Sequence, residues 1–225
     1  MTSKGDSTFP TRQEAVGFIL VDAGVSEYDV MYETQRTLVD KKKQDHLAYD
    51  YLIFVEHPDV YTYGRKSKIP APENFPNAFE VERGGEVTFH TVGQLVCYPI
   101  LRLVESERDL HLHLRRLEWT LMDVLRDFGI EAEQREGATG VWIVGEEKKI
   151  ASIGVAVASW VTYHGCALNV DNDLSGFAKI NPCGFNPEVM TSMKAVLGDK
   201  CPSISEVKES FLNHFGAHFS RTLLL

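Results

Sequence analysis

Three stretches of the chain place apolar residues at the three- and four-residue spacing of an amphipathic helix. They cover residues 26 to 42, 106 to 128 and 203 to 220. Each opens with a capping signal, a serine followed three residues later by an acidic residue. The predicted apolar faces are Tyr28, Met31, Tyr32, Leu38 and Val39; Leu110, Leu114, Leu117, Leu121, Val124, Leu125 and Phe128; and Val207, Phe211, Phe215 and Phe219. We expect three scaffold helices.

Six shorter stretches are apolar and rich in β-branched residues, which is typical of buried strands. They cover residues 16 to 21, 49 to 55, 95 to 101, 141 to 144, 150 to 157 and 160 to 170. A turn is expected at Ala23-Gly24, a hairpin turn over residues 145 to 148 and another turn at Ala158-Ser159. The first hairpin delivers Lys149 to the beginning of the next strand.

Two glycines, Gly154 and Gly165, stand inside these predicted strands, where glycine weakens pairing. A ligand or another backbone passing close explains them best. A further pair, Gly84-Gly85, permits positive φ and lets a bound chain approach the backbone. Thr88 and the histidine two residues later would point the same way if their segment is extended.

Composition limits the class of protein. The chain has 225 residues, 44% of them apolar, with no repeat, which predicts a polar, flexible lead-in over residues 1–12 and one globular domain over residues 13–225. A net charge of −9 disfavours nucleic-acid binding. No apolar run is long enough to span a bilayer, and the four cysteines show no CxxC spacing and follow no leader peptide. We expect a soluble protein of the reducing cytoplasm.

Candidate chemistry centres on Lys149 and Cys183. Lys149 opens a strand, whereas Cys183 lies in a Pro-Cys-Gly turn, so a strand lysine can be aimed at a loop cysteine. A thiol with a pKa of about 8.5 is only about 3% thiolate at pH 7, and a nearby ammonium favours the thiolate. The pair could form an activated nucleophile for acyl transfer.

The remaining candidates have simpler interpretations. Cys97 and Cys166 lie within apolar strands as small core residues, and Cys201 precedes a proline near the last helix. His57 is typical of a turn residue that bonds locally. His111 and His113, two apart on a predicted helix, lie on different faces, which argues against a metal site.

The sequence resembles the lipoyl(octanoyl) transferases, which move octanoyl from octanoyl-acyl carrier protein to a lysine of a lipoyl domain. Several blocks, in the order of that family, cover roughly residues 15 to 190. They are Glu56-His57-Pro58, Tyr61-Thr62-Tyr63-Gly64-Arg65, Arg83-Gly84-Gly85-Glu86-Val87-Thr88-Phe89-His90 with Gly93-Gln94-Leu95, Thr139-Gly140-Val141-Trp142, Lys149-Ile150-Ala151-Ser152-Ile153-Gly154, Trp160-Val161-Thr162-Tyr163-His164-Gly165, Ala167-Leu168-Asn169 and Pro182-Cys183-Gly184.

This resemblance implies an α/β fold of the α+β type, with the mixed sheet of the biotin and lipoate protein ligase catalytic domain backed by the three helices. It implies that Cys183 forms a thioester acyl-enzyme and that Lys149 tunes its acidity. In the family the lysine directly precedes Ile-Ala, so the resemblance selects Lys149 and not Lys148. Lys148 is then expected to be a surface charge. The implied substrate-binding residues are Arg83, Gly84, Gly85, Glu86, Val87, Thr88, Phe89, His90, Ser152, Ile153, Gly154, Gly165, Cys166 and Ala167.

The resemblance also implies the partners. The donor would be octanoyl-acyl carrier protein, and the acceptors would be lipoyl domains of 2-oxoacid dehydrogenase complexes and the glycine cleavage H-type protein. No metal, nucleotide or other cofactor is implied, because a thioester is already activated. Such partners are acidic, so we expect docking beside Arg65, Lys66, Lys68 and Arg83, the first three within or next to an irregular loop expected over residues 66 to 80.

Two alternatives stay open. One is an ATP-dependent lipoate or biotin-type protein ligase, which is similar in fold but activates a free acid and needs no Pro-Cys-Gly nucleophile. The other is a non-catalytic module that binds lipoyl domains or carrier proteins. The non-catalytic alternative is supported by one difference from the family: the chain has Thr91-Val92 where the family usually has Gly-Pro after the histidine. This difference changes the loop but no ionisable group.

Overall fold

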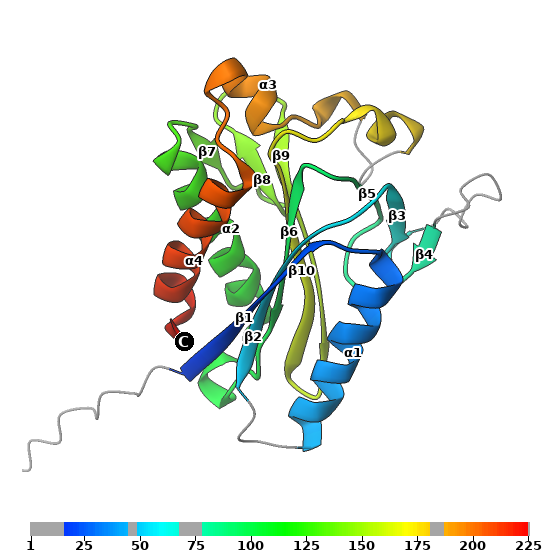
Figure 1. The fold of residues 1–225 in the computed structure, drawn as a ribbon, viewed down its shortest axis with the longest axis vertical. Helices are drawn as coiled ribbons and strands as arrows, with labels where there is room; N and C mark the ends of the chain where they lie inside the picture. The colour runs from blue at the N-terminus through cyan, green and yellow to red at the C-terminus, as the bar shows by residue number, and fades with distance from the viewer. Residues whose placement is uncertain (1–15, 45–48, 68–77, 181–186, 225) are drawn as a thin grey trace, which may run out of the picture.

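The structure is a computed structural model that describes residues 16–44, 49–67, 78–180 and 187–224. The predicted lead-in over residues 1–12 lies outside this part. An eight-stranded mixed sheet runs through the described fold in the order β11-β1-β2-β6-β10-β9-β8-β7 (Figure 1). The strands are β1 Val16–Val25, β2 Asp50–Glu56, β6 Gln94–Ile100, β7 Ala132–Glu133, β8 Val141–Ile143, β9 Lys149–Ala158, β10 Val161–Asn169 and β11 Arg221–Leu223.

The predicted mixed sheet is confirmed by the strand directions. β1 runs parallel to both of its neighbours, β2 and β11, whereas the pairs from β2 through β7 are antiparallel. The two predicted hairpins, β8-β9 and β9-β10, are also present. The tight turn between β9 and β10 has positive φ at Ser159 and Trp160, which suits the twist of a two-residue hairpin.

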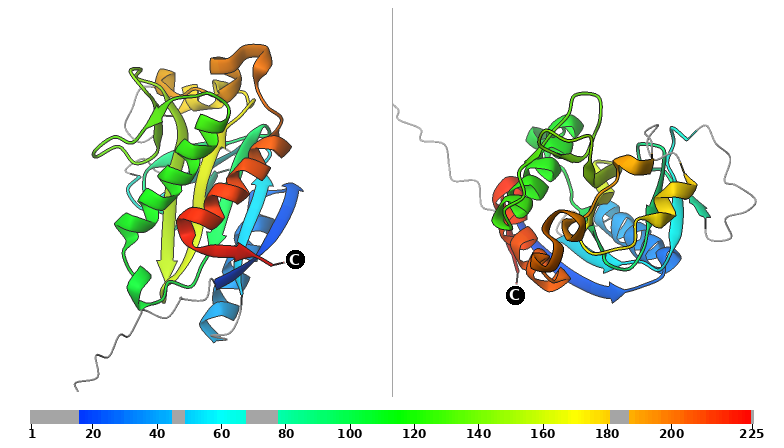
Figure 2. Two further views of the ribbon diagram at one scale, coloured as in Figure 1. Left: turned by 90° about the vertical axis from the view of Figure 1, so that its left-hand side faces the viewer. Right: turned by 90° about the horizontal axis from the view of Figure 1, so that it is seen from above.

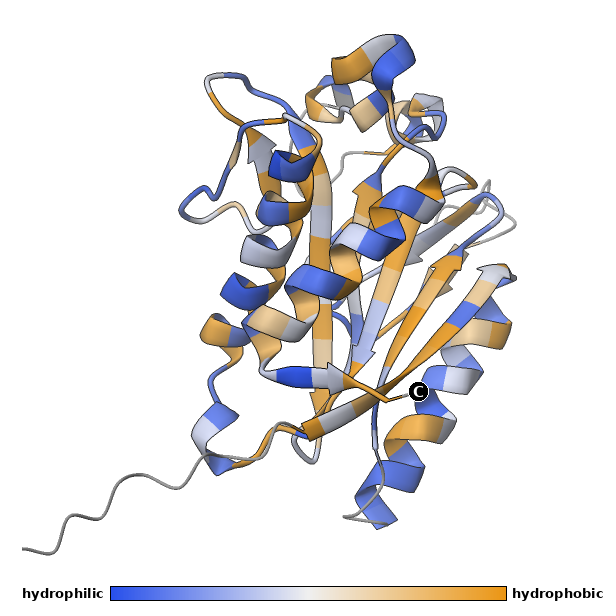
Figure 3. Cartoon of the chain, turned by 60° about the vertical axis from the view of Figure 1, so that its left-hand side comes forward, coloured by the Kyte–Doolittle hydropathy of each residue, from blue (hydrophilic) through white to orange (hydrophobic). Residues whose placement is uncertain are grey.

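Helices cover both faces of this sheet. α2 (Leu110–Asp127) and α4 (Ile204–Phe219) lie side by side on one face, and α1 (Tyr28–Gln44) covers the other (Figures 1 and 2). Figure 3 shows the apolar sides of α2 and α4 turned toward the apolar strands and their polar sides turned outward. The four predicted apolar residues of the last helix are all buried there. Burial of these faces is the main force that fixes the helices.

A smaller sheet with the order β4-β3-β5 lies beside the large one and contains β3 (Val60–Tyr63), β4 (Ala78–Glu80) and β5 (Val87–His90). The prediction of an irregular loop over residues 66 to 80 is therefore wrong at its end, since residues 78–80 pair in parallel with β3. Residues 68–77 of that loop are outside the described residues. β5 is extended as expected.

The predicted element ends are close, with two corrections. Ala23-Gly24 is no turn: β1 continues through it with a register shift against β2, and Gly24 takes a φ of +56°. α2 starts later than Ser106, because the Asp109 carboxylate accepts a hydrogen bond from the Leu112 amide and caps the helix. The capping box of α4, Ser203 with Glu206, is confirmed.

A short helix, α3 (Met193–Leu197), and 3-10 turns at Ser175–Lys179, Pro187–Val189 and Gly198–Lys200 connect β10 to α4. A further 3-10 turn, Glu105–Glu107, precedes α2. Its Glu107 accepts two hydrogen bonds from Arg221 of β11. Arg221 also donates to Asp50, and Asp50 forms an ion pair with Lys42 at 2.7 Å. This buried ionic cluster fastens the C-terminal strand, and each charge in it has an opposite partner.

Candidate active site

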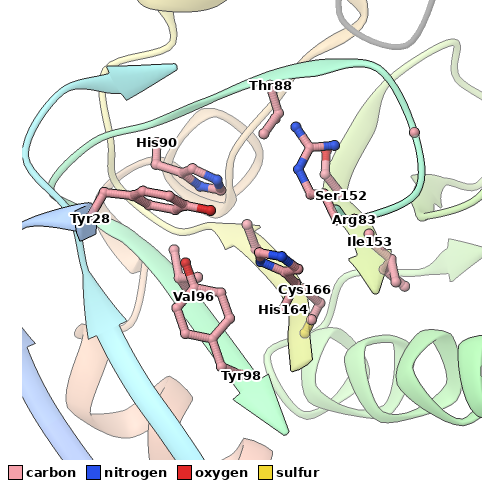
Figure 4. Close-up of a pocket in the computed structure, with 14 residues that line it drawn as sticks. Tyr28, Arg83, Thr88, His90, Val96, Tyr98, Ser152, Ile153, His164 and Cys166 are labelled. Atoms are coloured by element: carbon pink, nitrogen blue, oxygen red, sulfur yellow. The ribbon is translucent and has the colours of Figure 1, made fainter. Parts of the chain in front are cut away.

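A buried cavity lies where the small sheet meets β6, β9, β10 and the start of α1 (Figure 4). The empty space of the cavity and its solvent-open mouth together is about 480 Å³. The side chains of Tyr28, Arg83, His90 and His164 come from four different segments and face this space. The lining residues are Tyr28, Arg83, Gly85, Thr88, His90, Val96, Tyr98, Ser152, Ile153, Gly154, His164, Gly165, Cys166 and Ala167. A partly apolar cavity with a few polar groups suits a flexible apolar ligand.

The orientation of His90 follows from a chain of buried amides. His90 Nδ1 lies 2.7 Å from Gln94 Oε1, and Gln94 Nε2 donates to Asn169 Oδ1 at 2.8 Å. Because the Gln94 oxygen only accepts, Nδ1 carries the ring proton and Nε2 is left as an acceptor. Asn169 Nδ2 in turn donates to the Thr191 carbonyl, and the Thr191 amide donates to the Lys149 carbonyl. Hydrogen bonds therefore connect the cavity wall to the strand that carries Lys149.

The imidazoles at the cavity are neutral near pH 7. Burial lowers the pKa of His90 to about 3, with the neighbouring His57 adding to the shift. Burial also lowers the pKa of His164 to about 3, helped by the charge of Arg83. Behind the cavity, His57 has its pKa lowered to about 4 by burial and bonds the Ser26 carbonyl and the Tyr98 hydroxyl. The expectation that His57 bonds locally within its turn is therefore wrong, because Ser26 and Tyr98 are distant from it in the sequence.

His164 has an unusual backbone conformation and a buried ring nitrogen without a hydrogen-bond partner among the described residues. It takes a φ of +57°, which costs a non-glycine residue free energy, and its amide donates to Gln35 of α1 at 2.7 Å. Its buried Nε2 has no hydrogen-bond partner among the described residues and lies 3.9 Å from a Glu82 oxygen. The ring also stacks on Tyr32. Helix α1 thus holds His164 against the cavity, and a ligand atom could satisfy Nε2.

Arg83 is a wall of the cavity and not a surface cation. Only 8% of it is exposed, and its guanidinium donates to the Thr62 carbonyl and hydroxyl and to the Gly84 carbonyl. The prediction that Arg83 flanks the site as a docking charge is therefore wrong. The sequence could not show that β3 passes close enough to bury it. Arg65 and Lys66 are exposed, whereas Lys68 lies outside the described residues.

Close backbone approach explains both strand glycines, as expected. A Cβ on Gly154 would lie 2.9 Å from the Gly84 carbonyl oxygen, and one on Gly165 would lie 2.1 Å from the Cys97 carbonyl oxygen. The Gly84 amide donates to the Val155 carbonyl at 3.0 Å, so the two-glycine segment is fastened onto β9. That bond occupies the Gly84 amide, which leaves Gly85 as the better candidate for an oxyanion donor in this pair.

Lys149 faces a groove next to the cavity. Gly85, Ile153 and Gly154 line both spaces, so the groove and the cavity share a wall. The groove is lined by Lys66, Gly84, Gly85, Glu86, Leu110, Leu114, Gly137, Ala138, Thr139, Lys149, Ile153, Gly154 and Val155.

The Lys149 amine is held at a defined place. Nζ donates to the Thr139 carbonyl at 2.8 Å and lies 5.5 Å from the centre of the Trp142 ring. Only 3% of the residue is exposed. Lys148 points elsewhere, as strand alternation predicts, and donates to the Glu188 carbonyl instead of being fully solvated.

Cys183 falls in residues 181–186, outside the described residues. The described chain on its C-terminal side forms a parallel bridge between Met190 and Lys149. The other three thiols have ordinary core surroundings: Cys97 and Cys166 are buried opposite each other on β6 and β10, and Cys201 is half-buried. Burial raises the pKa of the Cys97 thiol and of the Cys201 thiol, which disfavours their thiolates.

The structure brings together most of the predicted substrate-binding residues. Those that line the cavity are Arg83, Gly85, Thr88, His90, Ser152, Ile153, Gly154, Gly165, Cys166 and Ala167, and those that line the groove include Gly84 and Glu86. Val87 and Phe89 line neither. They alternate to the other side of β5 and pack into an apolar cluster with Tyr61 and Phe177.

Several lining residues were not predicted: Tyr28, Val96, Tyr98 and His164. His164 was within reach, since a histidine directly before a strand glycine in a matching block is a usable signal. Tyr28 was not, because its apolar helix face has an ordinary core explanation.

The described residues contain no cluster of three or more histidines, cysteines or carboxylates that could hold a metal ion. Among the same residues, no helix is both long and apolar enough to cross a membrane.

A profile of the lipoyl protein ligase A/B catalytic domain matches residues 27–216 of the chain. The chain belongs to this family. It is 43% identical over 195 residues to the octanoyltransferase of Synechococcus elongatus, covering 82% of this chain and 79% of the relative. It is 44% identical over 191 residues to the octanoyltransferase of Gloeobacter violaceus, covering 83% and 82%. The resemblance to octanoyltransferases stated from the sequence is thereby confirmed.

Solved structures support the fold class. Lipoate-protein ligase A bound with ATP superposes with a TM-score of 0.68 at 16% identity, covering 93% of this chain and 89% of that one. The biotin protein ligase of Aquifex aeolicus, in complex with biotin and ATP, gives 0.51 at 12% identity, covering 90% and 70%. At these identities the likeness concerns the fold alone, and it confirms the predicted catalytic fold shared by biotin and lipoate ligases.

Proposed function

We propose that the protein is an octanoyltransferase of lipoylation. It moves octanoyl from octanoyl-acyl carrier protein, through a thioester on Cys183, to a lysine of a lipoyl domain. The observation that carries the proposal is the adjacency of a partly apolar cavity to a groove holding one buried lysine, in a chain more than 40% identical to named octanoyltransferases.

The cavity is proposed to take the acyl chain. Apolar wall atoms of residues such as Val96, Ile153 and Ala167 remove methylenes from water, at about 0.8 kcal/mol for each buried CH2. The neutral imidazoles add no charge that would need solvation. A thioester carbonyl at the shared wall would then lie near the Gly85 backbone and the groove.

The groove is proposed to hold the chemistry. The Cys183 thiolate attacks the thioester carbonyl, and the departing carrier thiolate takes a proton from the Lys149 ammonium. In the second step the acceptor amine attacks the new thioester and gives a proton to neutral Lys149, while the Cys183 thiolate leaves. The proton lost in the first step is regained in the second, so the pair ends as it began.

Three observations support this assignment of roles. Lys149 begins β9 and faces the groove, and the segment after Cys183 returns to pair with it at Met190. The thiols of Cys97 and Cys201 have raised pKa values, which makes them poor nucleophiles.

The acceptors are proposed to be lipoyl domains, including those of 2-oxoacid dehydrogenase complexes and the glycine cleavage H-type protein. The enzyme is proposed to need no cofactor and to act in the cytoplasm.

The test is transfer of octanoyl to a purified lipoyl domain without ATP. Octanoyl-carrier protein should modify the lipoyl domain, and the intact enzyme should gain one octanoyl group that Cys183→Ser loses. Cys97→Ser should keep the adduct, as a matched control. Modification only from octanoic acid with ATP would favour a ligase, and binding without modification would favour a non-catalytic module.

A further inference from the structure

Helix α2, which the sequence assigned to the scaffold, carries a buried carboxylate, Glu118. Its side chain is 2% exposed, and it lies among the buried residues of the helix. A buried carboxylate is costly unless its oxygens are used. Both are: Oε2 accepts from Arg115 at 2.7 Å, and Oε1 accepts from the Gly140 amide at 3.1 Å.

The Gly140 amide belongs to the same peptide group as the Thr139 carbonyl, which accepts the Lys149 amine at 2.8 Å. One planar peptide therefore stands between the carboxylate and the ammonium, with its N–H toward Glu118 and its C=O toward Lys149. A carboxylate that binds the N–H polarises the peptide and makes its carbonyl a better acceptor for a cation.

The surrounding residues fix this peptide in place. Gly140 takes a φ of +127°, and a Cβ there would lie 2.5 Å from the Lys149 Cε and from the Ala151 carbonyl oxygen. The backbone thus approaches the lysine as closely as a glycine allows. Arg115 also binds Gln134, which steadies the ion pair behind the carboxylate.

We propose that Glu118 is a positioning residue for the transfer reaction, because its carboxylate orients the Thr139–Gly140 peptide that holds the Lys149 amine in the groove. This inference rests on the proposed role of Lys149. Glu118 itself lines neither the cavity nor the groove, so it acts through the peptide and not on the substrate.

The first experiment compares Glu118→Gln and Glu118→Leu in steady-state transfer. Glu118→Gln keeps an oxygen for the Gly140 amide but removes the charge, and kcat should fall about 10-fold. Glu118→Leu removes both and should lower kcat about 100-fold. KM for the octanoyl donor should stay within about twofold. Asp127→Asn, on the same helix with its carboxylate bound to Ser210 and His214 of α4, is the matched control and should keep its kcat.

A double variant separates positioning from a general structural effect. In a Lys149→Met background, Glu118→Gln should cause no further loss, because the amine it positions is gone. A further loss of about 10-fold there would overturn the inference. If Lys149→Met alone transfers at the wild-type rate, the proposed function of Lys149 fails, and that result does not depend on any Glu118 variant.

A measurement without turnover tests the contact directly. In protein labelled with ε-13C lysine, the Lys149 signal is the one missing from Lys149→Arg. That signal should shift in Glu118→Gln, because the peptide whose carbonyl binds the amine loses its charged partner. The other charged groups lining the groove, Lys66 and Glu86, are unchanged in this variant. An identical Lys149 signal in wild type and Glu118→Gln would refute positioning.

Discussion

The cavity and the groove share a wall but differ in the ionisable side chains that line them. In the cavity, the ionisable side chains are neutralised or bonded into the wall: burial keeps His90 and His164 uncharged, and Arg83 is bound to Thr62. In the groove, the Lys149 amine is held by the Thr139 carbonyl, and Lys66 and Glu86 line the same space. One space suits an apolar chain, and the other suits proton transfer.

The single strand β9 contributes to both the groove and the cavity. β9 enters the groove at Lys149, and four to five residues later the same strand forms the shared wall at Ile153 and Gly154. A change to the start of the strand should therefore affect chemistry, and a change deeper in the cavity should affect which chain binds. The predictions below separate the two.

The largest effect is expected from the groove. Lys149→Met should lower transfer at pH 7 by about 10²- to 10⁴-fold, because it removes the amine that we propose favours the Cys183 thiolate and accepts the proton of the second step. Binding of an unreactive octanoyl thioether to the cavity should change little. Lys149→Arg should still form the acyl-enzyme but discharge it slowly, since a guanidinium keeps its proton. Intact mass against time measures both steps. Equal loss of ligand binding and transfer would contradict the division.

The cavity should respond with a change of specificity. Ala167 is buried on β10 and lines the cavity, so Ala167→Leu fills space that the far methylenes of the acyl chain would occupy. Excluding about two methylenes costs roughly 1.6 kcal/mol and should raise KM for octanoyl about 10-fold. Hexanoyl should suffer less, and kcat should be kept for both.

Ala195→Leu, on the exposed side of α3, is the matched control, and melting curves check that the cavity variant remains folded. A uniform fall in kcat for every chain length would mean that Ala167 does not border the acyl chain.

How far the sequence predicts this arrangement depends on the range of each contact. The hairpin that delivers Lys149, the cap of the last helix and the reason for Gly154 follow from local periodicity and glycine chemistry, and the structure confirms them. The small sheet, the burial of Arg83 and the placement of Tyr28 at the cavity come from contacts between residues distant in sequence. No local pattern encodes those pairings.

Glu118 shows the same limit at a single residue. Its position fits an ordinary helix surface by spacing, and only the fold brings the Gly140 turn over it.

A smaller, reversible effect is expected from acid. Four buried histidines have lowered pKa values, about 3 for His90 and His164 and about 4 for His57 and His113, mainly through burial. Unfolded histidine binds a proton below about pH 6.5, while these native imidazoles do not. The unfolded state therefore binds more protons between about pH 6.5 and 4, and stability is lost as pH falls through that window.

The melting temperature should fall steadily from about pH 7 to about pH 5, and unfolding near pH 5 should take up protons. His113 lies on the opposite face, against α4, so His113→Phe removes one proton from the uptake without touching the cavity. A flat melting temperature across this range would mean that the cavity imidazoles are solvated.

The smallest effect is expected where partners approach the groove. Arg65 and Lys66 are exposed beside the two-glycine segment, and Lys66 lines the groove, so they are the described cations best placed to meet an acidic carrier protein. Reversing both, as Arg65→Glu with Lys66→Glu, should lower kcat/KM for octanoyl-carrier protein about 3- to 10-fold at low salt, because exposed charge pairs contribute only about 0.2–1 kcal/mol each. The double variant should use a small octanoyl thioester as efficiently as the wild type does.

Lys41→Glu with Lys43→Glu, at the far end of α1, changes the net charge equally and should leave the use of both substrates unaffected. The difference between the two double variants should shrink as salt rises, since screening weakens exposed charges. If both pairs lower carrier use to the same extent, net charge alone governs the encounter and the rim of the groove has no docking role.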